Sequence, residues 1–129
     1  MKAGGTKSYK NLIVWQRAME LAQELYNLSR LLPHTEMFGL AAQLRRGAVS
    51  IPSNIAEGNG RRRVGDYIRF LLLARGASQE IETQLLIAKN LNYLSESAMA
   101  PAARLNDEIG RMLSTIARGL ARHRQRMDQ

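Results

Sequence analysis

Apolar residues recur at alternating spacings of four and three along most of the chain, which is the pattern of helices packed in a bundle. The first such series begins at Val14 and ends at Leu32, directly before Pro33. It predicts a helix whose core face is Val14, Ala18, Leu21, Leu25, Leu28 and Leu32. Three further series predict core faces at Met37, Leu40, Leu44, Gly47, Ile51 and Ile55; at Phe70, Ala74, Ala77, Ile81, Leu85 and Ala88; and at Leu105, Ile109, Met112, Ile116 and Leu120.

These four helices are joined by short connections, so sequential neighbours should run antiparallel. The second helix should end at Gly58 or Gly60, and the third should begin near Asp66, a residue type that caps helices. Residues 90–97 form the next connection. We therefore predict an all-α fold, an antiparallel up-down four-helix bundle, as a single domain over residues 1–129. Residues 1–8 are predicted to be a flexible lead-in and residues 124–129 a basic tail.

Pro52 falls inside the second apolar series. A proline in a helix lacks the N–H that would bond the carbonyl of Ala48 and crowds that carbonyl, at a cost of about 3 kcal/mol. Either the helix bends at Pro52 or it ends at Ser50. The spacing from Ile51 to Ile55 continues across the proline and favours a bend.

The third helix is apolar on a second side, which is away from its core face. This side carries Leu72, Leu73, Leu86 and Ile87, separated by small or polar residues. A helix that is apolar on two sides should be buried on two sides, and no helix of a lone four-helix bundle is enclosed all round. We predict that these four residues contact another subunit; the alternative is leucines scattered on the surface of a monomer.

Charge is the feature of composition that bears on function. The chain has 19 Lys and Arg against 11 Asp and Glu, a formal net charge of +8. Such an excess favours polyanionic partners, although a basic surface can also serve solubility alone. The absence of cysteine excludes disulfides, thiol catalysis and cysteine-ligated metal. No signal peptide and no apolar run near the ~20 residues of a membrane span is present, so we expect a cytoplasmic protein without membrane contact.

No motif for catalysis, metal or cofactor binding is found. Neither His34 nor His123 follows a glutamate by three residues, so the di-iron motif of helical bundles is missing. Glu80 and Glu82 are two residues apart and should point in different directions on a helix, where pairing with arginines is their expected role. The glycines from Gly58 to Gly65 lack the spacing and the Lys-Ser/Thr of a phosphate-binding loop. We expect a protein that is not an enzyme and has no cofactor.

Arginines form the candidate binding site. Arg61, Arg62 and Arg63 follow the end of the second helix, where one arginine would satisfy the helix dipole. In the fourth helix, Arg104 and Arg111 have acidic neighbours four residues away, Glu108 and Asp107, whereas the arginines that follow have only Asp128. The residues predicted to contact phosphates are Arg45, Arg46, Arg61, Arg62, Arg63, Arg118, Arg122, Arg124 and Arg126; a solvated basic tail is the alternative for the last of these.

Aromatic residues are only 5% of the chain, and Trp15, Tyr26, Phe38 and Phe70 are placed where core packing would use them. Without aromatic side chains for base stacking, recognition should depend on phosphates and shape, with strong salt dependence and little sequence information.

Several segments resemble one known family. They are 9–16, Gly39-Leu40 through Arg45-Arg46, 50–58 and 80–85, of which the segment Ser50–Gly58 is the most specific. They resemble the four-helix-bundle proteins encoded within intervening sequences of bacterial large-subunit ribosomal RNA genes, to which the accessory variability determinants of diversity-generating retroelements are similar. The run Arg61-Arg62-Arg63-Val64-Gly65 departs from the usual pattern, in which a shorter basic stretch and a Ser/Thr cap are typical.

The resemblance implies a homopentamer arranged as a tapered barrel with a basic surface and no catalytic residues. For the retroelement branch it implies binding to a reverse transcriptase and its structured RNA during mutagenic cDNA synthesis. We therefore predict a nucleic-acid-binding accessory protein, with RNA favoured over DNA. The alternative is a structural scaffold that binds a protein partner and has no direct role with nucleic acid.

Overall fold

The computed structural model describes residues 8–128, and in that range its regular structure is entirely helical. Four long helices are present: α1 (Ile13–Ser29), α2 (Leu40–Asn59), α3 (Val64–Asn90) and α4 (Glu96–Met127). Within residues 8–128, short 3-10 helices precede α1 and α2: η2 (Tyr9–Asn11) and η3 (His34–Glu36). Residues 1–7 of the predicted lead-in and Gln129 lie outside the described residues.

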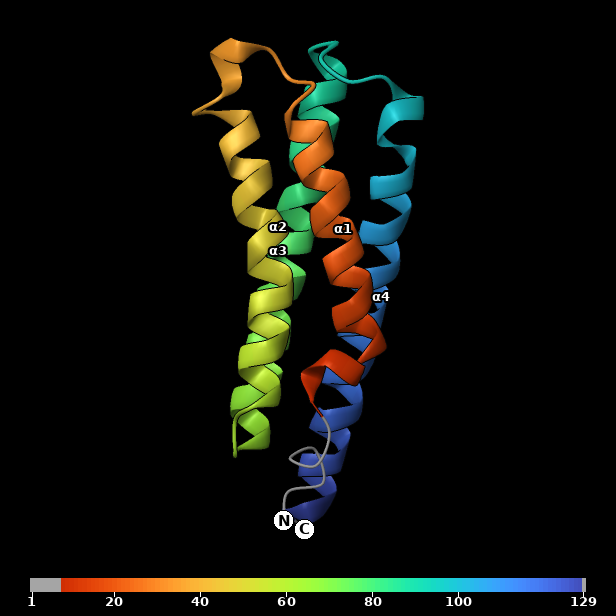
Figure 1. Ribbon diagram of the computed structural model, residues 1–129. Helices are drawn as coiled ribbons and strands as arrows, with labels where there is room; N and C mark the ends of the chain where they lie inside the picture. The colour runs from red at the N-terminus through yellow and green to blue at the C-terminus, as the bar shows by residue number, and fades with distance from the viewer. Residues whose placement is uncertain (1–7, 129) are drawn as a thin grey trace.

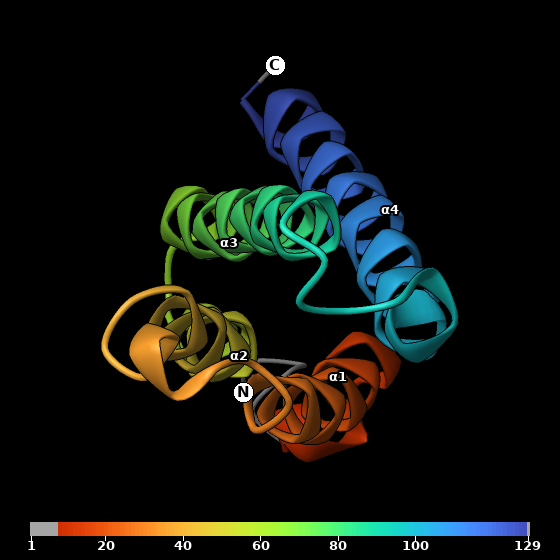
Figure 2. The ribbon, with the colours of Figure 1, turned by 90° about the horizontal axis from the view of Figure 1, so that it is seen from above.

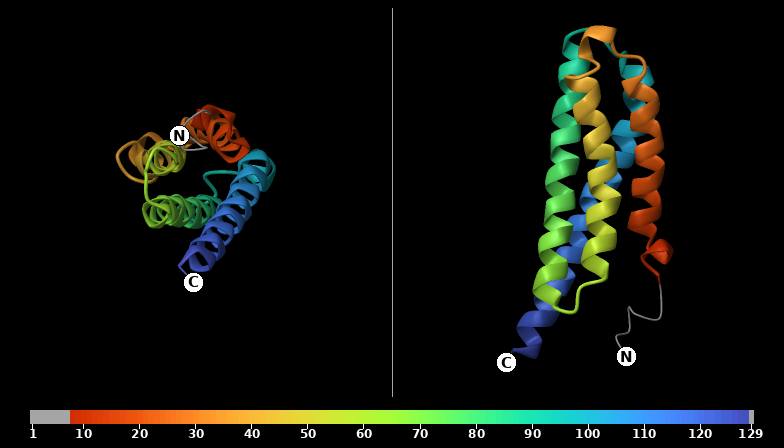
Figure 3. Two further views of the ribbon diagram at one scale, coloured as in Figure 1. Left: turned by 90° about the horizontal axis from the view of Figure 1, so that it is seen from below. Right: turned by 60° about the vertical axis from the view of Figure 1, so that its left-hand side comes forward.

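The four helices form an antiparallel up-down bundle, as predicted (Figure 1). Seen from above, they lie in the order α1, α2, α3, α4 around a common core, so α1 also contacts α4 (Figure 2). The α1–α2 and α3–α4 connections share one end of the bundle, and the α2–α3 turn lies at the other (Figure 1). The last turns of α4 project beyond the other helices at the end with the α2–α3 turn (Figure 3).

The core face of α1 is buried as predicted, from Val14 to Leu28; Leu32 is also buried, but it follows the helix, which ends at Ser29 and not at Leu32. In α3, Ala74, Ala77, Ile81, Leu85 and Ala88 are also buried. The prediction for α4 is only partly correct: Ile109 is buried, but the neighbouring core positions are Met99, Ala102, Asn106, Leu113 and Ala117. The other predicted positions of α4, such as Met112 and Ile116, are only partly buried and pack at the edge of the core. The buried face of α4 therefore differs from the predicted one. Asn106 belongs to the buried face, and apolar spacing does not assign a polar residue to the core.

The α1–α2 connection corrects two predictions. Met37 and Phe38 precede α2, which begins at Leu40, and Phe38 is 88% exposed instead of packed in the core. Glu36 sets this start, because its Oε1 accepts a hydrogen bond from the backbone N–H of Leu40 (2.9 Å). Its Oε2 accepts a hydrogen bond from the Tyr93 hydroxyl (3.3 Å), which links the α1–α2 connection to the α3–α4 connection. Burial, and then the charge of Glu36, raise the pKa of Tyr93 above its usual value.

At the other end, α3 begins at Val64, slightly earlier than predicted. Leu71 takes the fully buried position that was predicted for Phe70, and Phe70 is only partly buried. Gly58 of α2 allows this packing: a Cβ at Gly58 would lie 2.7 Å from the Cβ of Phe70. The two helices can approach this closely because Gly58 has no side chain.

Helix α2 continues through Pro52 without a break, and Pro52 is buried. The proline removes a hydrogen bond to Ala48. In the same turn, Asn54 Nδ2 donates to the carbonyl oxygen of Ser50 (2.8 Å) and to its hydroxyl (3.1 Å). These side-chain bonds add support to the turn that the proline weakens.

Candidate nucleic-acid interface

The α2–α3 turn and the end of α4 bring most of the predicted arginines together. Arg61, Arg62 and Arg63 are exposed in the turn, and Arg122, Arg124 and Arg126 are exposed in the last turns of α4. A Cβ at Gly65, in the first turn of α3, would lie 2.7 Å from Nη1 of Arg124, so the Arg124 side chain reaches the start of α3. We call this group the basic end; it consists of Arg61, Arg62, Arg63, Arg122, Arg124 and Arg126.

Arg61 differs from the rest of the basic end because it is already engaged. Its Nη2 lies 2.8 Å from Oε2 of Glu57, and its guanidinium lies 4.8 Å from the centre of the Phe70 ring. Arg69 approaches the same ring at 4.6 Å. Arg61 therefore helps to hold the turn in place, and its charge is partly neutralised.

The other five arginines of the basic end have no carboxylate partner. Within residues 8–128, no Asp or Glu oxygen lies within 4.0 Å of the guanidinium groups of Arg62, Arg63, Arg122, Arg124 or Arg126. The remaining acidic residues of these segments are Asp66 and Asp128. Positive charge is thus concentrated and solvent-accessible at this end of the bundle.

Arg17 of α1 shows the contrasting arrangement. It lies 3.0 Å from Glu20 and 3.6 Å from Glu108. The hydrogen bond to Glu20, followed by the charges of Glu20 and Glu108, raises the pKa of Arg17. Glu108 was predicted to pair with Arg104 within α4, but it pairs across helices with Arg17. The predicted pair of Arg111 and Asp107 is present at 3.1 Å.

Arg45 and Arg46 lie apart from the basic end. Arg46 lies in the first half of α2, 13 residues before the last residue of the helix, Asn59, which corresponds to roughly 20 Å along the axis. Arg45 donates from Nη2 to the carbonyl oxygen of Met37 (3.0 Å) and so fixes the α1–α2 connection. Arg46 is exposed beside a depression of about 840 Å³ between α2 and α3. The nine predicted arginines therefore do not form one continuous patch.

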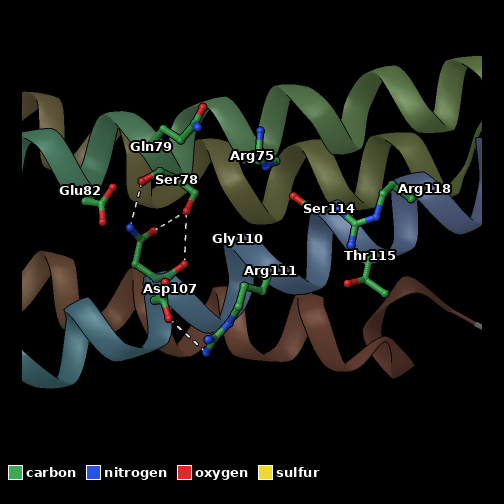
Figure 4. Close-up of a pocket in the computed structure, with 11 residues that line it drawn as sticks. Arg75, Ser78, Gln79, Glu82, Asp107, Gly110, Arg111, Ser114, Thr115 and Arg118 are labelled. Atoms are coloured by element: carbon green, nitrogen blue, oxygen red, sulfur yellow. Dashed lines mark hydrogen bonds and ion pairs between the residues drawn. The ribbon is translucent and has the colours of Figure 1, made fainter.

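Arg118 lines a separate cavity of about 390 Å³ between α3 and α4 (Figure 4). Arg75, Arg111 and the hydroxyl residues Ser114 and Thr115 also line it. Its inner wall includes Ser78 and Asn106, which are both buried. No sequence motif points to Arg75, because the register of α3 against α4 decides which side chains share a groove.

Ser78 and Asn106 satisfy each other across the α3–α4 contact. Ser78 Oγ donates to Asn106 Oδ1 (2.8 Å), and Asn106 Nδ2 donates to the carbonyl oxygen of Ser78 (2.9 Å). Two reciprocal bonds fix the relative position of the helices at this level. The cavity therefore has a rigid inner wall.

The four apolar residues predicted to form an oligomer contact lie on the outer side of α3. Leu72, Leu73, Leu86 and Ile87 are 50%, 49%, 50% and 42% exposed. Leu72 and Leu73 border a shallow depression that also includes Gly76 and Glu80. Their role in assembly stays a prediction.

Carboxylates are not gathered for catalysis or metal binding in the described residues. Glu80 borders the depression between α2 and α3, whereas Glu82 lines the cavity between α3 and α4. Neither forms an ion pair within residues 8–128, contrary to the expectation that they pair with arginines. No group of three or more potential metal-ligating side chains occurs in this part of the chain. None of its helices is long and apolar enough to cross a bilayer.

The fold matches a solved structure, described as a protein of unknown function from the S23 ribosomal protein family of Bacteroides thetaiotaomicron VPI-5482. The TM-score is 0.76 and the sequences are 24% identical, over 81% of this chain and 98% of the other. A comparison with curated proteins finds no match. The model of the family described as "23S rRNA-intervening sequence protein" matches residues 10–115. This match covers four helices in whole or in large part, and the chain therefore belongs to the 23S rRNA-intervening sequence protein family.

Proposed function

We propose that the protein is a nucleic-acid-binding accessory protein without catalytic activity, and that the basic end contacts the phosphates of an RNA. The observation that carries this proposal is the group of five arginines without carboxylate partners at one end of the bundle, within residues 8–128. Guanidinium groups that are exposed and unpaired can replace the counterions of a phosphate backbone. Arg46 and Arg118 would extend the contact only if the nucleic acid also ran along the sides of the bundle.

Assembly through the outer side of α3 is the second part of the proposal. Four large apolar residues that are about half exposed on one helix are typical of a surface that another subunit covers. A homopentamer, as the family resemblance implies, would present five basic ends to the same RNA. A reverse transcriptase is the protein partner that the resemblance to retroelement accessory proteins suggests.

The RNA-binding proposal is tested by measuring fluorescence anisotropy of a labelled structured RNA over a range of salt concentrations. If five subunits each neutralise one phosphate, log K should fall against log salt with a slope of about −4 to −5. The double substitution Arg62→Gln/Arg63→Gln should make the slope shallower, by roughly 0.7 to 0.9 for each phosphate that is no longer neutralised. A response that does not change with salt would remove the proposal.

The matched control is Arg30→Gln/Arg104→Gln, which removes the same charge from the half of the bundle with the α1–α2 and α3–α4 connections. Arg30 and Arg104 are exposed, and within residues 8–128 neither forms an ion pair. The control should keep the salt slope of the unmodified protein. An equal change of slope in both variants would mean that net charge, and not the basic end, determines binding.

The assembly proposal is tested by light scattering of Leu73→Arg. A charge placed in an apolar contact between subunits is costly to bury, so the variant should be monomeric. Leu31→Arg is the control, because Leu31 is 61% exposed at the α1–α2 connection and away from α3. It should keep the mass of the unmodified protein. An unchanged mass for Leu73→Arg would exclude this side of α3 as the contact.

A scaffold that binds a protein partner is the second candidate. It is favoured by the exposure of Leu31 and Phe38 at the end opposite to the basic end. Recovery of a polymerase partner that persists after nuclease treatment would support it, whereas release of the partner by nuclease would support binding through RNA.

A further inference from the structure

The cavity between α3 and α4 has charges of opposite sign at its two ends. Arg75 of α3 and Arg118, Ser114 and Thr115 of α4 lie toward one end, and Ser114 lies between the two arginines in Figure 4. Glu82 and Asp107 lie toward the other end (Figure 4). Asp107 already binds Arg111 at 3.1 Å, whereas Glu82 forms no ion pair within residues 8–128.

The arginine end of the cavity has free hydrogen-bond donors. Within the described residues, neither Arg75 nor Arg118 has a carboxylate within 4.0 Å. The hydroxyls of Ser114 and Thr115 lie beside them and can donate to an oxyanion. On the inner wall, Ser78 and Asn106 already bond each other. Two guanidinium groups with nearby hydroxyls are a favourable setting for a phosphate, since bonds to ionised groups are the strong ones.

The acidic end of the cavity restricts which phosphate can bind. A nucleic-acid strand that ran through the groove would bring its next phosphate toward Glu82 and Asp107, where like charges repel. A terminal phosphate avoids this repulsion when the uncharged nucleoside that carries it faces the carboxylates, so any further phosphates of a strand must leave the groove before Glu82. The size of the cavity, about 390 Å³, suits a ligand of the order of one nucleotide.

The geometry points to a binding site for a terminal phosphate, a phosphomonoester held by Arg75 and Arg118 with Ser114 and Thr115. Its source is a free nucleoside monophosphate or the phosphorylated end of a nucleic-acid strand. The site is distinct from the basic end, and Arg75 is not among the arginines assigned to the RNA contact. Binding here does not require that the basic end bind RNA.

Isothermal titration calorimetry of the full chain with adenosine monophosphate and with adenosine tests the site. The monophosphate should bind and adenosine should not. A second pair of ligands distinguishes a strand end from a free nucleotide: a short single-stranded RNA with a 5′-phosphate and the same RNA with a 5′-hydroxyl. Both are titrated into the Arg62→Gln/Arg63→Gln variant, in which contacts at the basic end are weakened. Preference for the 5′-phosphate identifies a strand end as the source, whereas binding of the monophosphate alone identifies a free nucleotide.

The variant Arg75→Gln should weaken binding of the phosphorylated ligand about tenfold or more, because it removes charge-assisted bonds. Arg104→Gln is the matched control: an exposed arginine of the same groove-forming helix α4 that does not line the cavity and forms no ion pair in residues 8–128. It should leave the affinity unchanged. Thermal melting followed by circular dichroism should show that both variants are folded.

Two outcomes would overturn the inference. One is equal affinity for phosphorylated and unphosphorylated ligands, or no binding of either. The other is an Arg75→Gln variant that binds as tightly as Arg104→Gln. The RNA-binding proposal is tested separately. Its failure would appear as a flat dependence of RNA affinity on salt, or as an unchanged salt slope for Arg62→Gln/Arg63→Gln.

Discussion

Helix α3 meets α2 on one side and α4 on the other, and the two contacts are built differently. Against α2, the start of α3 depends on a missing side chain: a Cβ at Gly58 would lie 2.7 Å from the Cβ of Phe70 and 3.0 Å from Cδ1 of Tyr67. Against α4, the contact includes buried polar side chains, Ser78 and Asn106, that satisfy each other.

A glycine is present on the α4 side too, but it is not needed for close approach. A Cβ at Gly110 would lie 3.4 Å from Oγ of Ser78, which is close to ordinary van der Waals contact. The α2 side also has a polar pair: Gln84 Nε2 donates to Gln43 Oε1 (3.2 Å), while Gln84 Oε1 is buried without a partner in residues 8–128. The contact between α2 and α3 is thus limited by the space available at Gly58, whereas the contact between α3 and α4 is held by the hydrogen bonds of Ser78 and Asn106.

Alanine should destabilise the protein at Gly58 but not at Gly110. This is the largest difference in the free energy of unfolding that we expect. Gly58→Ala should lower the free energy of unfolding by about 2 kcal/mol, because the backbones of α2 and α3 must separate. Gly110→Ala should be neutral or stabilise by up to about 1 kcal/mol, because alanine favours the helix and meets little obstruction. Urea denaturation of both variants measures the difference. Equal stability of the two variants would mean that the space for a side chain is the same at both contacts.

Asn106→Leu tests the hydrogen bonds on the α4 side. The substitution approximately retains the volume but leaves Ser78 without the side-chain acceptor Oδ1, which should cost about 1–2 kcal/mol. The double variant Ser78→Ala/Asn106→Leu removes both polar side chains and should recover part of this stability. Chemical denaturation of the single and double variants measures the coupling free energy between Ser78 and Asn106. A double variant that is less stable than the single one by the full cost of a second substitution would mean that the two residues act independently.

Gln84→Met should have the smallest effect. It removes a buried oxygen that has no partner in residues 8–128, and it also removes the Nε2 donor of Gln43, whose exposed side chain can bond water instead. The gain and the loss should nearly cancel, so the free energy of unfolding should change by less than about 0.5 kcal/mol. Gln43→Met is its counterpart, since it leaves Gln84 Nε2 without its acceptor and should cost about 1 kcal/mol. In thermal denaturation, Gln84→Met should melt at a higher temperature than Gln43→Met. The reverse order would mean that the Gln84 oxygen has a hydrogen-bond partner.

Much of the fold could be predicted because apolar spacing reports which face of a helix is buried. The spacing identified α1 and most of α3 correctly, since Val14 to Leu32 and Ala74 to Ala88 follow one pattern of burial. It was wrong for Phe38, because Glu36 and its bond to Leu40 start α2 after that residue. It was also wrong for much of α4, because the buried polar residue Asn106 belongs to a face that apolar spacing does not identify.

The candidate site was harder to predict, because side chains from different helices form it. Sequence spacing placed Glu108 beside Arg104, but α1 supplies the closer partner, Arg17. The run from Arg61 to Arg63 and the end of α4 are recognisable as basic segments, whereas their meeting at Gly65 and Arg124 depends on the bundle. Arg75 was missed because only the packing of α3 on α4 places it beside Arg118.

The projection of α4 past its neighbours has a consequence for local stability. From Arg122 to Asp128 every residue is exposed, so these turns are held by backbone bonds within the helix and by little packing. Such a segment can fray without unfolding the core, and its amide protons should exchange with solvent much faster than those of the buried turns around Ile109. Three of the arginines that carry the proposed function, Arg122, Arg124 and Arg126, therefore lie where the chain can adjust its shape to a ligand at little energetic cost.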